Sequence, residues 1–305
     1  MGIAVIFPGQ GTQVPHMGDP WRASESWRVV DQAELALGIP ISHLLLDADE
    51  AGLARTRDAQ LAVLVASLMA WDAVRDSLGV PVAFAGHSLG QITALVASGA
   101  LTLEDGVRLA GQRAERTQEA ADRRPGRMAA FVGAGLEQAE LACADPGGQE
   151  CWVANDNAPG QVVVGGTAEG VQRSTDRARA LGVRRVVPLN VGAAFHTPLM
   201  SDAAAAFSAD LADTRFSAPT APVVCNVDAE AHGDDQWHDR LARHLLSPVR
   251  WRQSMQTLVD LGADTFVEVG PGAVLSGLAR RTVPNVATRT VSSPQDLPAL
   301  AEVAN

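Results

Sequence analysis

The chain of 305 residues is long enough to bury a large core, either in one domain or in a main domain with a smaller one. Hydrophobic residues make up 47% of it and charged residues 19%, which is the composition of an ordered globular protein. The formal net charge of −11 argues against nucleic acid as the main partner, because phosphate binding needs a basic surface.

The sequence starts with a short apolar run, residues 2–7 (GIAVIF), which ends at a Pro-Gly pair and predicts a buried strand followed by a loop. This run has no basic segment before it and is too short for a secretory signal or a membrane span. We therefore expect a cytoplasmic protein without a membrane segment. The three cysteines include no C-x-x-C pair, so they predict neither a disulfide framework nor a zinc site.

A predicted helix and a short predicted strand lead into a serine motif. Apolar residues recur at helical spacing over residues 59–78, and a Gly-Val-Pro sequence would end that helix. The apolar segment 82–86 (VAFAG) follows and runs directly into Gly86–Gly90 (GHSLG), after which residues 92–101 have a helical composition. The G-x-S-x-G motif therefore lies between a strand and a helix, which is the setting of a nucleophilic serine.

A different pattern begins near Met128 and continues to Asn190. Its order of strand, helix, two strands, helix and strand is that of a ferredoxin-like unit, which we expect to be inserted into a larger α/β body. The predicted segments are strands 128–133, 151–155, 161–166 and 183–190 and helices 136–143 and 169–181. Later strands at 220–227 and 263–270 each follow a helical or loop segment, as a mainly parallel sheet requires. The last twenty or so residues predict a loosely attached tail.

Ser88, the serine of the motif, needs a partner before it can react. A serine hydroxyl is a weak nucleophile until a base removes its proton. The backbone N–H of Leu89 is a candidate oxyanion donor, because the residue after the nucleophile normally has this role. The pentapeptide alone would also fit a polar residue in a tight turn, since the chain contains 28 glycines.

The base must be one of seven histidines. His196 follows a predicted strand and precedes a proline that can open a helix, a position that favours it. His87 adjoins the serine, where neighbouring side chains point apart, and we expect it to pack behind the site. Spacing alone does not decide between His196 and His244. The other four are predicted to lie on the surface: His16, His43, His232 and His238.

Eight motifs follow one another along nearly the whole chain, and in them it resembles the malonyl-CoA:acyl carrier protein transacylases of fatty acid synthesis and the acyltransferases of polyketide synthesis. The motifs are FPGQGTQ (7–13), DAQLAVLVASL (58–68), GHSLGQ (86–91), QRAERTQEA (112–120), NDNAPGQVVVGG (155–166), AFHTPLM (194–200), SPVRW (247–251) and EVGPG (268–272). The resemblance implies an α/β fold. An α/β-hydrolase-like catalytic subdomain with a mainly parallel sheet would comprise residues 1–125 and 191–305, and residues 126–190 would form an inserted ferredoxin-like subdomain.

The resemblance also implies a reaction. Ser88 would attack the thioester of an acyl-CoA with His196 as its base, and the acyl group would then pass to the phosphopantetheine thiol of a carrier protein. The backbone amides of Gln10 and Leu89 would hold the oxyanion. In this family a backbone carbonyl near His244 orients the base, and His244 stands where the family commonly has Gln. The CoA thioester is a substrate, so we expect neither a cofactor nor a metal.

The same resemblance suggests which acyl group is carried. Arg113 falls on the family's carboxylate-binding arginine, where a guanidinium can hold a malonyl carboxylate with two hydrogen bonds. Gln60 and Asn155 are implied as further polar contacts to the substrate. Phe195 gives the A-F-H form of malonyl-selecting acyltransferases. It fills the room that the 2-methyl branch of a methylmalonyl group would need, and one methyl group is worth about 1–3 kcal/mol of discrimination between substrates. Ala193 and Gln91 depart from the residues usual in the family.

The implied partners are an acyl carrier protein and malonyl-CoA or a related acyl-CoA, with no nucleic acid and no membrane, and we expect a monomer. Carrier proteins are acidic, so docking would use a local basic cluster: Arg123-Arg124 with Arg127, Arg184-Arg185, or Arg280-Arg281. Alternatives remain: a transferase for an unusual acyl unit or between two carrier proteins, an editing hydrolase of acyl carrier proteins, or a non-enzymatic binding protein. Arg113 argues against the hydrolase, and Ser88 together with His196 argues against the binding protein.

Overall fold

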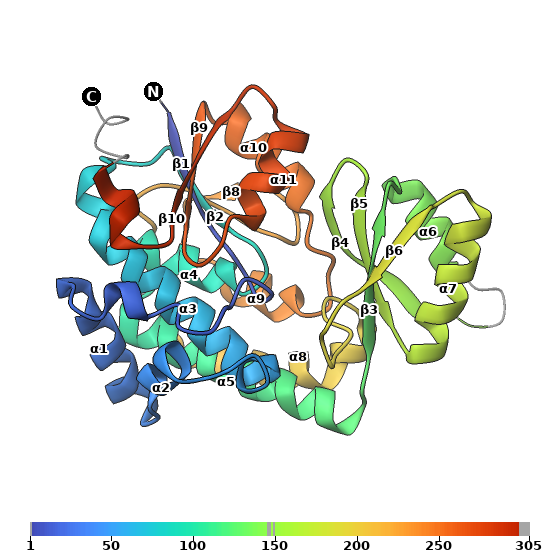
Figure 1. Ribbon diagram of the computed structural model, residues 1–305, viewed down its shortest axis with the longest axis horizontal. Coiled ribbons are helices and arrows are strands. Elements are labelled where there is room, and N and C mark those ends of the chain that lie inside the picture. Colours follow the sequence, from blue (N-terminus) through green and yellow to red (C-terminus); the bar gives the residue numbers. More distant parts are fainter. Residues whose placement is uncertain (1, 145–147, 149, 299–305) are drawn as a thin grey trace.

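The computed structural model describes residues 2–144, 148 and 150–298, which form a larger and a smaller subdomain side by side (Figure 1). The large subdomain is built on a six-stranded sheet with the order β10-β9-β1-β2-β7-β8. Its strands are β1 (Ile3–Phe7), β2 (Ala83–Gly86), β7 (Val223–Val224), β8 (Ala231–His232), β9 (Thr265–Val269) and β10 (Ala287–Val291). All neighbours pair in parallel except β7 and β8, so the expected mainly parallel sheet is confirmed.

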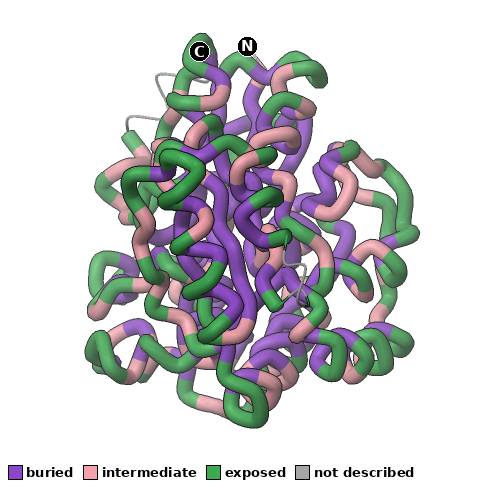
Figure 2. The backbone as a smooth tube through the Cα atoms, turned by 90° about the vertical axis from the view of Figure 1, so that its right-hand side faces the viewer, coloured by how far each residue is buried: buried purple, intermediate pink, exposed green. Residues whose placement is uncertain are grey.

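Both faces of this sheet are covered by helices. Along β1, Ile3, Val5 and Phe7 join one core cluster, while the alternate residues Ala4 and Ile6 join another on the opposite face. The backbone coloured by burial shows this continuous buried interior (Figure 2). The helices are α1 (Arg28–Leu37), α2 (Ile41–Leu46), α3 (Thr56–Val74), α4 (Gly90–Ala97), α5 (Leu103–Arg123), α8 (Ser201–Leu211), α9 (His238–His244), α10 (Trp251–Asp260) and α11 (Val274–Thr282). Among the described residues, no helix combines the length and the apolar character needed to cross a membrane.

The small subdomain has the predicted order of strands and helices. Its antiparallel sheet, with the order β4-β5-β3-β6, confirms the ferredoxin-like arrangement. The elements are β3 (Arg127–Val132), α6 (Leu136–Cys143), β4 (Cys151–Ala158), β5 (Gln161–Gly166), α7 (Ala168–Ala180) and β6 (Arg185–Pro188).

The prediction of a loosely attached C-terminal tail is wrong for Ala287–Val291. These residues form β10, which pairs with β9 over five positions, and Val291 is fully buried. The segment ATRTV escapes sequence analysis because an edge strand buries few side chains, and three of its five residues are polar. Residues 299–305, the rest of the predicted tail, lie outside the described residues.

A short backbone pairing joins the two subdomains. The Asp156 amide of β4 donates to the Val249 carbonyl, and the Val249 amide donates to the Ala154 carbonyl, each at 2.9 Å. Arg252 at the start of α10 adds an ion pair with the buried carboxylate of Asp156 at 2.8 Å. The small subdomain is thereby held beside the carboxyl ends of the parallel strands, where ligands bind in sheets of this kind.

Candidate active site

Ser88 lies in a tight turn between β2 and α4, as the sequence predicts. Its φ of 53° is in the left-handed region that few residues other than glycine adopt. A Cβ at Gly86 would lie 1.8 Å from the Gly90 carbonyl oxygen, and a Cβ at Gly90 would lie 2.3 Å from the Phe7 carbonyl oxygen. Both flanking glycines are therefore required by close backbone packing, and the turn between them presents Ser88 at the edge of the sheet.

His196 is the histidine that the fold brings to Ser88. Its Nε2 lies 2.7 Å from Ser88 Oγ, and its Nδ1 lies 2.9 Å from the backbone carbonyl oxygen of His244. Because a carbonyl can only accept, Nδ1 carries the proton and Nε2 is free to accept the proton of the serine. The His244 side chain points elsewhere, so of the two histidines that spacing left open, His196 is the one placed to act as the base.

The surroundings keep His196 neutral. Burial, and then the positive charge of Arg113, lower its pKa to about 3. An imidazole with such a pKa is unprotonated at neutral pH, which is the form that accepts a proton.

Arg113 of α5 is a buried cation beside the nucleophile. It is only 2% exposed, and its Nη2 donates to Ser88 Oγ at 3.1 Å. Its Nη1 donates to the Gln60 side-chain carbonyl, and Gln60 donates in turn to Thr117 Oγ1 at 2.9 Å. Burial lowers the pKa of Arg113 to about 10, so it stays charged at neutral pH. In the part of the chain that the structure describes, no carboxylate pairs with it, and its Nε has no hydrogen-bond partner.

A cavity of about 220 Å³ opens over Ser88, between the subdomains. Six of the residues singled out from the sequence line it: Gln10, Ser88, Arg113, Asn155, Phe195 and His196. Gln60 lies behind Arg113 and is not part of the lining, while Leu89 is fully buried beneath it. The lining also includes apolar residues that the sequence did not indicate, among them Met128 and Val163 of the small subdomain and Leu278 of α11.

Two backbone amides beside the serine are free to receive an oxyanion. Within the described residues, neither the Gln10 amide nor the Leu89 amide donates a hydrogen bond. A Cβ at Gly9 would lie 2.4 Å from the His87 carbonyl oxygen and 3.6 Å from Ser88 Cβ, so the Gly9–Gly11 loop packs directly on the turn. Unpaired amides at such a position suit a developing negative charge.

Two asparagines near the serine were missed by sequence reasoning. Asn157 of β4 lies 2.8 Å from His87 Nε2, whose ring packs edge-on against Trp251. Asn226 accepts a hydrogen bond from the Ser88 amide at 2.8 Å. A polar residue directly after a buried strand, at the carboxyl edge of a parallel sheet, is the signal that could have pointed to Asn226.

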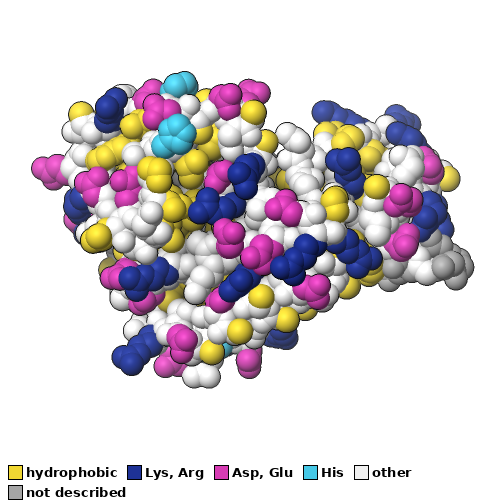
Figure 3. Space-filling view, turned by 90° about the horizontal axis from the view of Figure 1, so that it is seen from below, with side chains coloured by type: hydrophobic (Ala, Val, Ile, Leu, Met, Phe, Trp, Pro, Cys, Tyr) yellow, Lys and Arg dark blue, Asp and Glu magenta, His cyan; other side chains and the backbone are white. Residues whose placement is uncertain are grey.

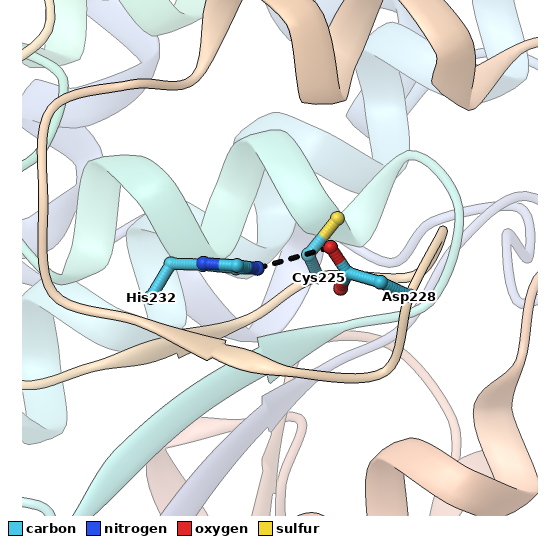
Figure 4. Close-up of side chains that lie close together, drawn as sticks. All are labelled: Cys225, Asp228 and His232. Carbon is cyan, nitrogen blue, oxygen red and sulfur yellow. Dashed lines mark hydrogen bonds and ion pairs between the residues drawn. The ribbon is translucent and has the colours of Figure 1, made fainter.

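One cluster of potential metal ligands lies in the turn between β7 and β8. Cys225, Asp228 and His232 have ligand atoms within 4.8 Å of one another, and Figure 4 shows the imidazole hydrogen-bonded to the carboxylate with the thiol beside them. Burial, as the main cause, raises the pKa of Cys225 to about 11, so the thiol is protonated at neutral pH. The structure thus shows a His232–Asp228 pair at 3.1 Å with a neutral thiol beside it.

The fold also brings together two cysteines from consecutive elements, one at the end of α6 and one at the start of β4. The Sγ atoms of Cys143 and Cys151, both buried in the small subdomain, lie 3.7 Å apart and are not joined by a disulfide. Their contact depends on the packing of α6 against β4, which spacing does not reveal.

Of the three basic clusters, Arg280-Arg281 lies beside the cavity. Arg281 donates to the Gln161 side chain at 2.5 Å, and Gln161 lines the cavity. Arg123 and Arg124 instead line a separate hollow between α5 and α8. On the face seen in Figure 3, basic and acidic side chains are interspersed and do not form a patch of one sign.

Comparisons with known proteins agree along the whole chain. The model of the acyl transferase domain family matches residues 5–298. The malonyl CoA-acyl carrier protein transacylase of Escherichia coli (strain K12) is 36% identical over 308 residues, covering 99% of both chains. A solved malonyl-CoA:acyl carrier protein transacylase from Xanthomonas oryzae pv. oryzae is also 36% identical, with a TM-score of 0.94 over 99% of each chain.

A further solved structure shows a relative bound to a partner. It is a type II polyketide synthase acyl carrier protein in complex with its malonyl-transacylase, which is 32% identical with a TM-score of 0.94 over 99% of this chain and 100% of that one. With a family model that matches nearly every residue and a relative of equal length at this level of identity, the chain belongs to the acyl transferase family.

Proposed function

We propose that this enzyme moves a malonyl group from coenzyme A to the phosphopantetheine thiol of an acyl carrier protein, through an ester on Ser88. The observation that supports this most is a buried guanidinium 3.1 Å from the nucleophilic oxygen, with no carboxylate of the described chain to pair with it. A buried cation without a counter-ion is costly. A carboxylate separated from the thioester carbonyl by one methylene group, as in a malonyl thioester, is a ligand that removes this cost.

In the first half-reaction, Ser88 Oγ attacks the thioester carbonyl carbon while His196 Nε2 takes its proton. The oxyanion of the tetrahedral intermediate is held by the Gln10 and Leu89 amides. When the intermediate collapses, the carbon–sulfur bond breaks, His196 returns the proton to the departing thiolate, and malonyl-Ser88 remains. The carrier protein thiol then gives its proton to His196 and attacks the ester, and Ser88 recovers its proton as it leaves.

Substrate binding and base strength are linked in this mechanism. The charge of Arg113 is the second cause of the low pKa of His196. A malonyl carboxylate on Arg113 neutralises that charge, so the pKa of His196 rises toward the range in which a base works well. An acetyl group gives no such compensation and leaves His196 a weaker base.

The cavity supports a small acyl group. Its volume of about 220 Å³ is below the roughly 300–1,000 Å³ of pockets for drug-sized ligands. Phe195 and Asn155 both lie in its wall, where Phe195 limits branching and Asn155 offers a polar contact.

Mass spectrometry of the intact protein tests the proposal. After mixing with malonyl-CoA, we expect a malonyl adduct that is absent in Ser88→Ala, a weaker adduct with methylmalonyl-CoA, and little with acetyl-CoA. Acetyl labelling as fast as malonyl labelling would contradict the role of Arg113. Adding a pantetheinylated carrier protein distinguishes transfer from hydrolysis: a transferase passes the adduct to the carrier faster than to water, whereas an editing hydrolase does not.

We also propose that the carrier protein docks next to Arg280-Arg281. This site is supported by the hydrogen bond between Arg281 and cavity-lining Gln161, and a carrier protein as the partner is supported by a solved relative that binds its own carrier protein. Opposite charges speed such encounters. The variant Arg280→Glu/Arg281→Glu is expected to slow transfer to the carrier roughly tenfold or more, with unchanged loading from malonyl-CoA. The matched variant Arg123→Glu/Arg124→Glu, at the hollow between α5 and α8, should transfer normally; equal slowing in both would reject this docking site.

The proposed setting is the cytoplasm, with the enzyme as a monomer that needs no prosthetic group or metal. The proposed reaction balances with the Ser88 and His196 side chains, two backbone amides, the CoA thioester and the carrier protein thiol. Sedimentation at micromolar concentration tests the monomer, and a dimer at that concentration would contradict it.

A further inference from the structure

Asn226, which follows β7, lies directly beneath the serine turn and is fully buried. Its Oδ1 accepts from the Ser88 amide at 2.8 Å, and its Nδ2 donates to the Gly86 carbonyl at 2.8 Å. Its own backbone amide donates to the Gln91 side chain at 2.9 Å. One side chain thus spans the turn from the last residue of β2 to the nucleophile.

The orientation of this carboxamide is fixed by its partners. A backbone N–H can only donate and a backbone carbonyl can only accept, so the oxygen must face Ser88 and the nitrogen must face Gly86. The turn needs such support, because a non-glycine residue with the φ of Ser88 costs about 1–3 kcal/mol and persists only when its surroundings hold it.

The same carboxamide is tied to the segment that orients the base. Asn226 Oδ1 lies 3.1 Å from His244 Nε2, while the backbone carbonyl of His244 accepts from His196 Nδ1 at 2.9 Å. Because Oδ1 can only accept, His244 carries its proton on Nε2. One side chain therefore connects the backbone of the nucleophile with the residue that aligns the base.

We propose that Asn226 is a positioning residue for acyl transfer, which fixes the Ser88 turn relative to the His244 carbonyl that orients His196. It touches neither the substrate cavity nor the reacting atoms and acts through Ser88 and His244. The proposal rests on the proposed function, since it concerns the rate at which Ser88 is acylated.

The first test is the variant Asn226→Ala in steady-state malonyl transfer from malonyl-CoA to a carrier protein. A small misplacement of reacting groups costs about a hundredfold in rate, so we expect kcat to fall by about that factor. The KM for malonyl-CoA should change less than about twofold, because Asn226 is not part of the cavity wall and contacts it only behind the Ser88 backbone. A kcat equal to that of the wild type would overturn the proposal.

The variant Asn226→Asp supplies a second readout if Asn226→Ala does not fold. Its carboxylate keeps the acceptor for Ser88 but has no hydrogen to donate to Gly86, whereas the protonated carboxyl restores both bonds. We expect its kcat, relative to the wild type at the same pH, to rise as pH falls. A ratio that does not vary with pH would overturn the proposal.

Other ionisable groups are common to both proteins in that ratio. His244 of α9 contacts position 226 directly, and His87, His196 and Arg113 are the charged or titratable neighbours of His244. Groups that do not contact position 226 contribute equally to both profiles, whereas a carboxylate there raises the pKa of His244, so the ratio reports the titration of the carboxyl and His244 as a pair.

Thr257→Val is the matched control. Thr257 Oγ1 of α10 donates to the Ala229 carbonyl at 2.7 Å and so braces the turn that follows Asn226, without contacting Ser88 or His244. It should lower the Tm but leave kcat intact; a loss of kcat as large as that of Asn226→Ala would reduce Asn226 to a merely structural role. Wild-type protein that forms no malonyl-Ser88 would instead contradict the proposed function and not the positioning role.

Discussion

At the scale of single residues, Arg113 stands out because its burial has an energetic cost that only a ligand repays. Its side chain is only 2% exposed and lies beside Ser88 and His196, where its charge lowers the pKa of His196. A side chain kept in a costly state where it faces a cavity indicates selection for binding and not for stability.

Replacing Arg113 by methionine separates these two properties. We expect Arg113→Met to lower kcat/KM for malonyl-CoA by roughly a hundredfold or more, since a buried charged hydrogen-bond pair is lost, while acetyl-CoA is loaded at least as fast as by the wild type. The Tm should rise, because an uncompensated buried charge is removed.

Arg116→Met is the matched control for that prediction. Arg116 lies one turn further along α5 and pairs with Asp210 at 2.9 Å, away from the cavity. Its replacement should lower the Tm slightly and leave malonyl loading unchanged. An equal loss of malonyl loading in both variants would show that the helix, and not the Arg113 charge, is responsible.

At the scale of elements, the turn between β2 and α4 depends on glycines that cannot carry a side chain. We expect Gly90→Ala to destabilise the protein by about 3 kcal/mol or more, because the new Cβ would meet the backbone oxygen of Phe7 at 2.3 Å. Chemical denaturation measures this directly.

At another position, the replacement of glycine by alanine should stabilise the protein. Gly277 lies inside α11, where a Cβ would meet nothing nearer than the end of the Arg280 side chain at 4.0 Å. Gly277→Ala should stabilise the protein by about 1 kcal/mol, as alanine does inside helices. Destabilisation by both variants would show that glycine replacement in general, and not the contact at Gly90, is what this protein does not tolerate.

Elements with a strong pattern were predictable from the sequence. The βαββαβ order of the small subdomain was predicted correctly. Residues 161–166, a valine run between turn signals, form β5 with the expected bounds. β7 keeps only Val223 and Val224 of the longer predicted strand. β10 was missed, because pairing at the edge of a sheet depends on the neighbouring strand more than on side-chain pattern.

The site was predictable only where chemistry selects the residue type. Ser88 and His196, the proposed nucleophile and base, lie in recognisable motifs. The proposed role of Asn226 depends on hydrogen bonds to the backbone of Ser88 and Gly86, 138 and 140 residues away, and Gln60 contacts Arg113, so neither role could be read from local sequence.

At the scale of the whole molecule, two buried histidines link folding to pH. Burial is the main cause that lowers the pKa of His196 to about 3 and that of His244 well below its usual value. The unfolded chain binds these protons below its ordinary histidine pKa of about 6.5, whereas the folded protein does not. Stability is therefore full above that pH and is lost as the pH falls below it.

The expected loss is about 1.4 kcal/mol per pH unit for each histidine between about pH 6 and 4. His244→Gln, which removes one of the two, should make the free energy of unfolding less steep by that amount over the same range. Urea denaturation across this pH range measures both slopes, and the carboxylates common to both proteins cancel in the difference. Identical slopes would show that His244 titrates normally.

The chain leaves the large subdomain and re-enters it at two positions that lie next to each other. The Gly126 amide donates to the Gly192 carbonyl at 3.0 Å, so the two crossings of the chain are side by side. The nucleophile, its base and Arg113 all lie outside the insert, which supplies Met128, Asn155 and Val163 to the cavity wall. The insert therefore shapes part of the cavity wall and, through Asn157, also contacts His87 beside the proposed nucleophile, while Ser88, His196 and Arg113 belong to the large subdomain.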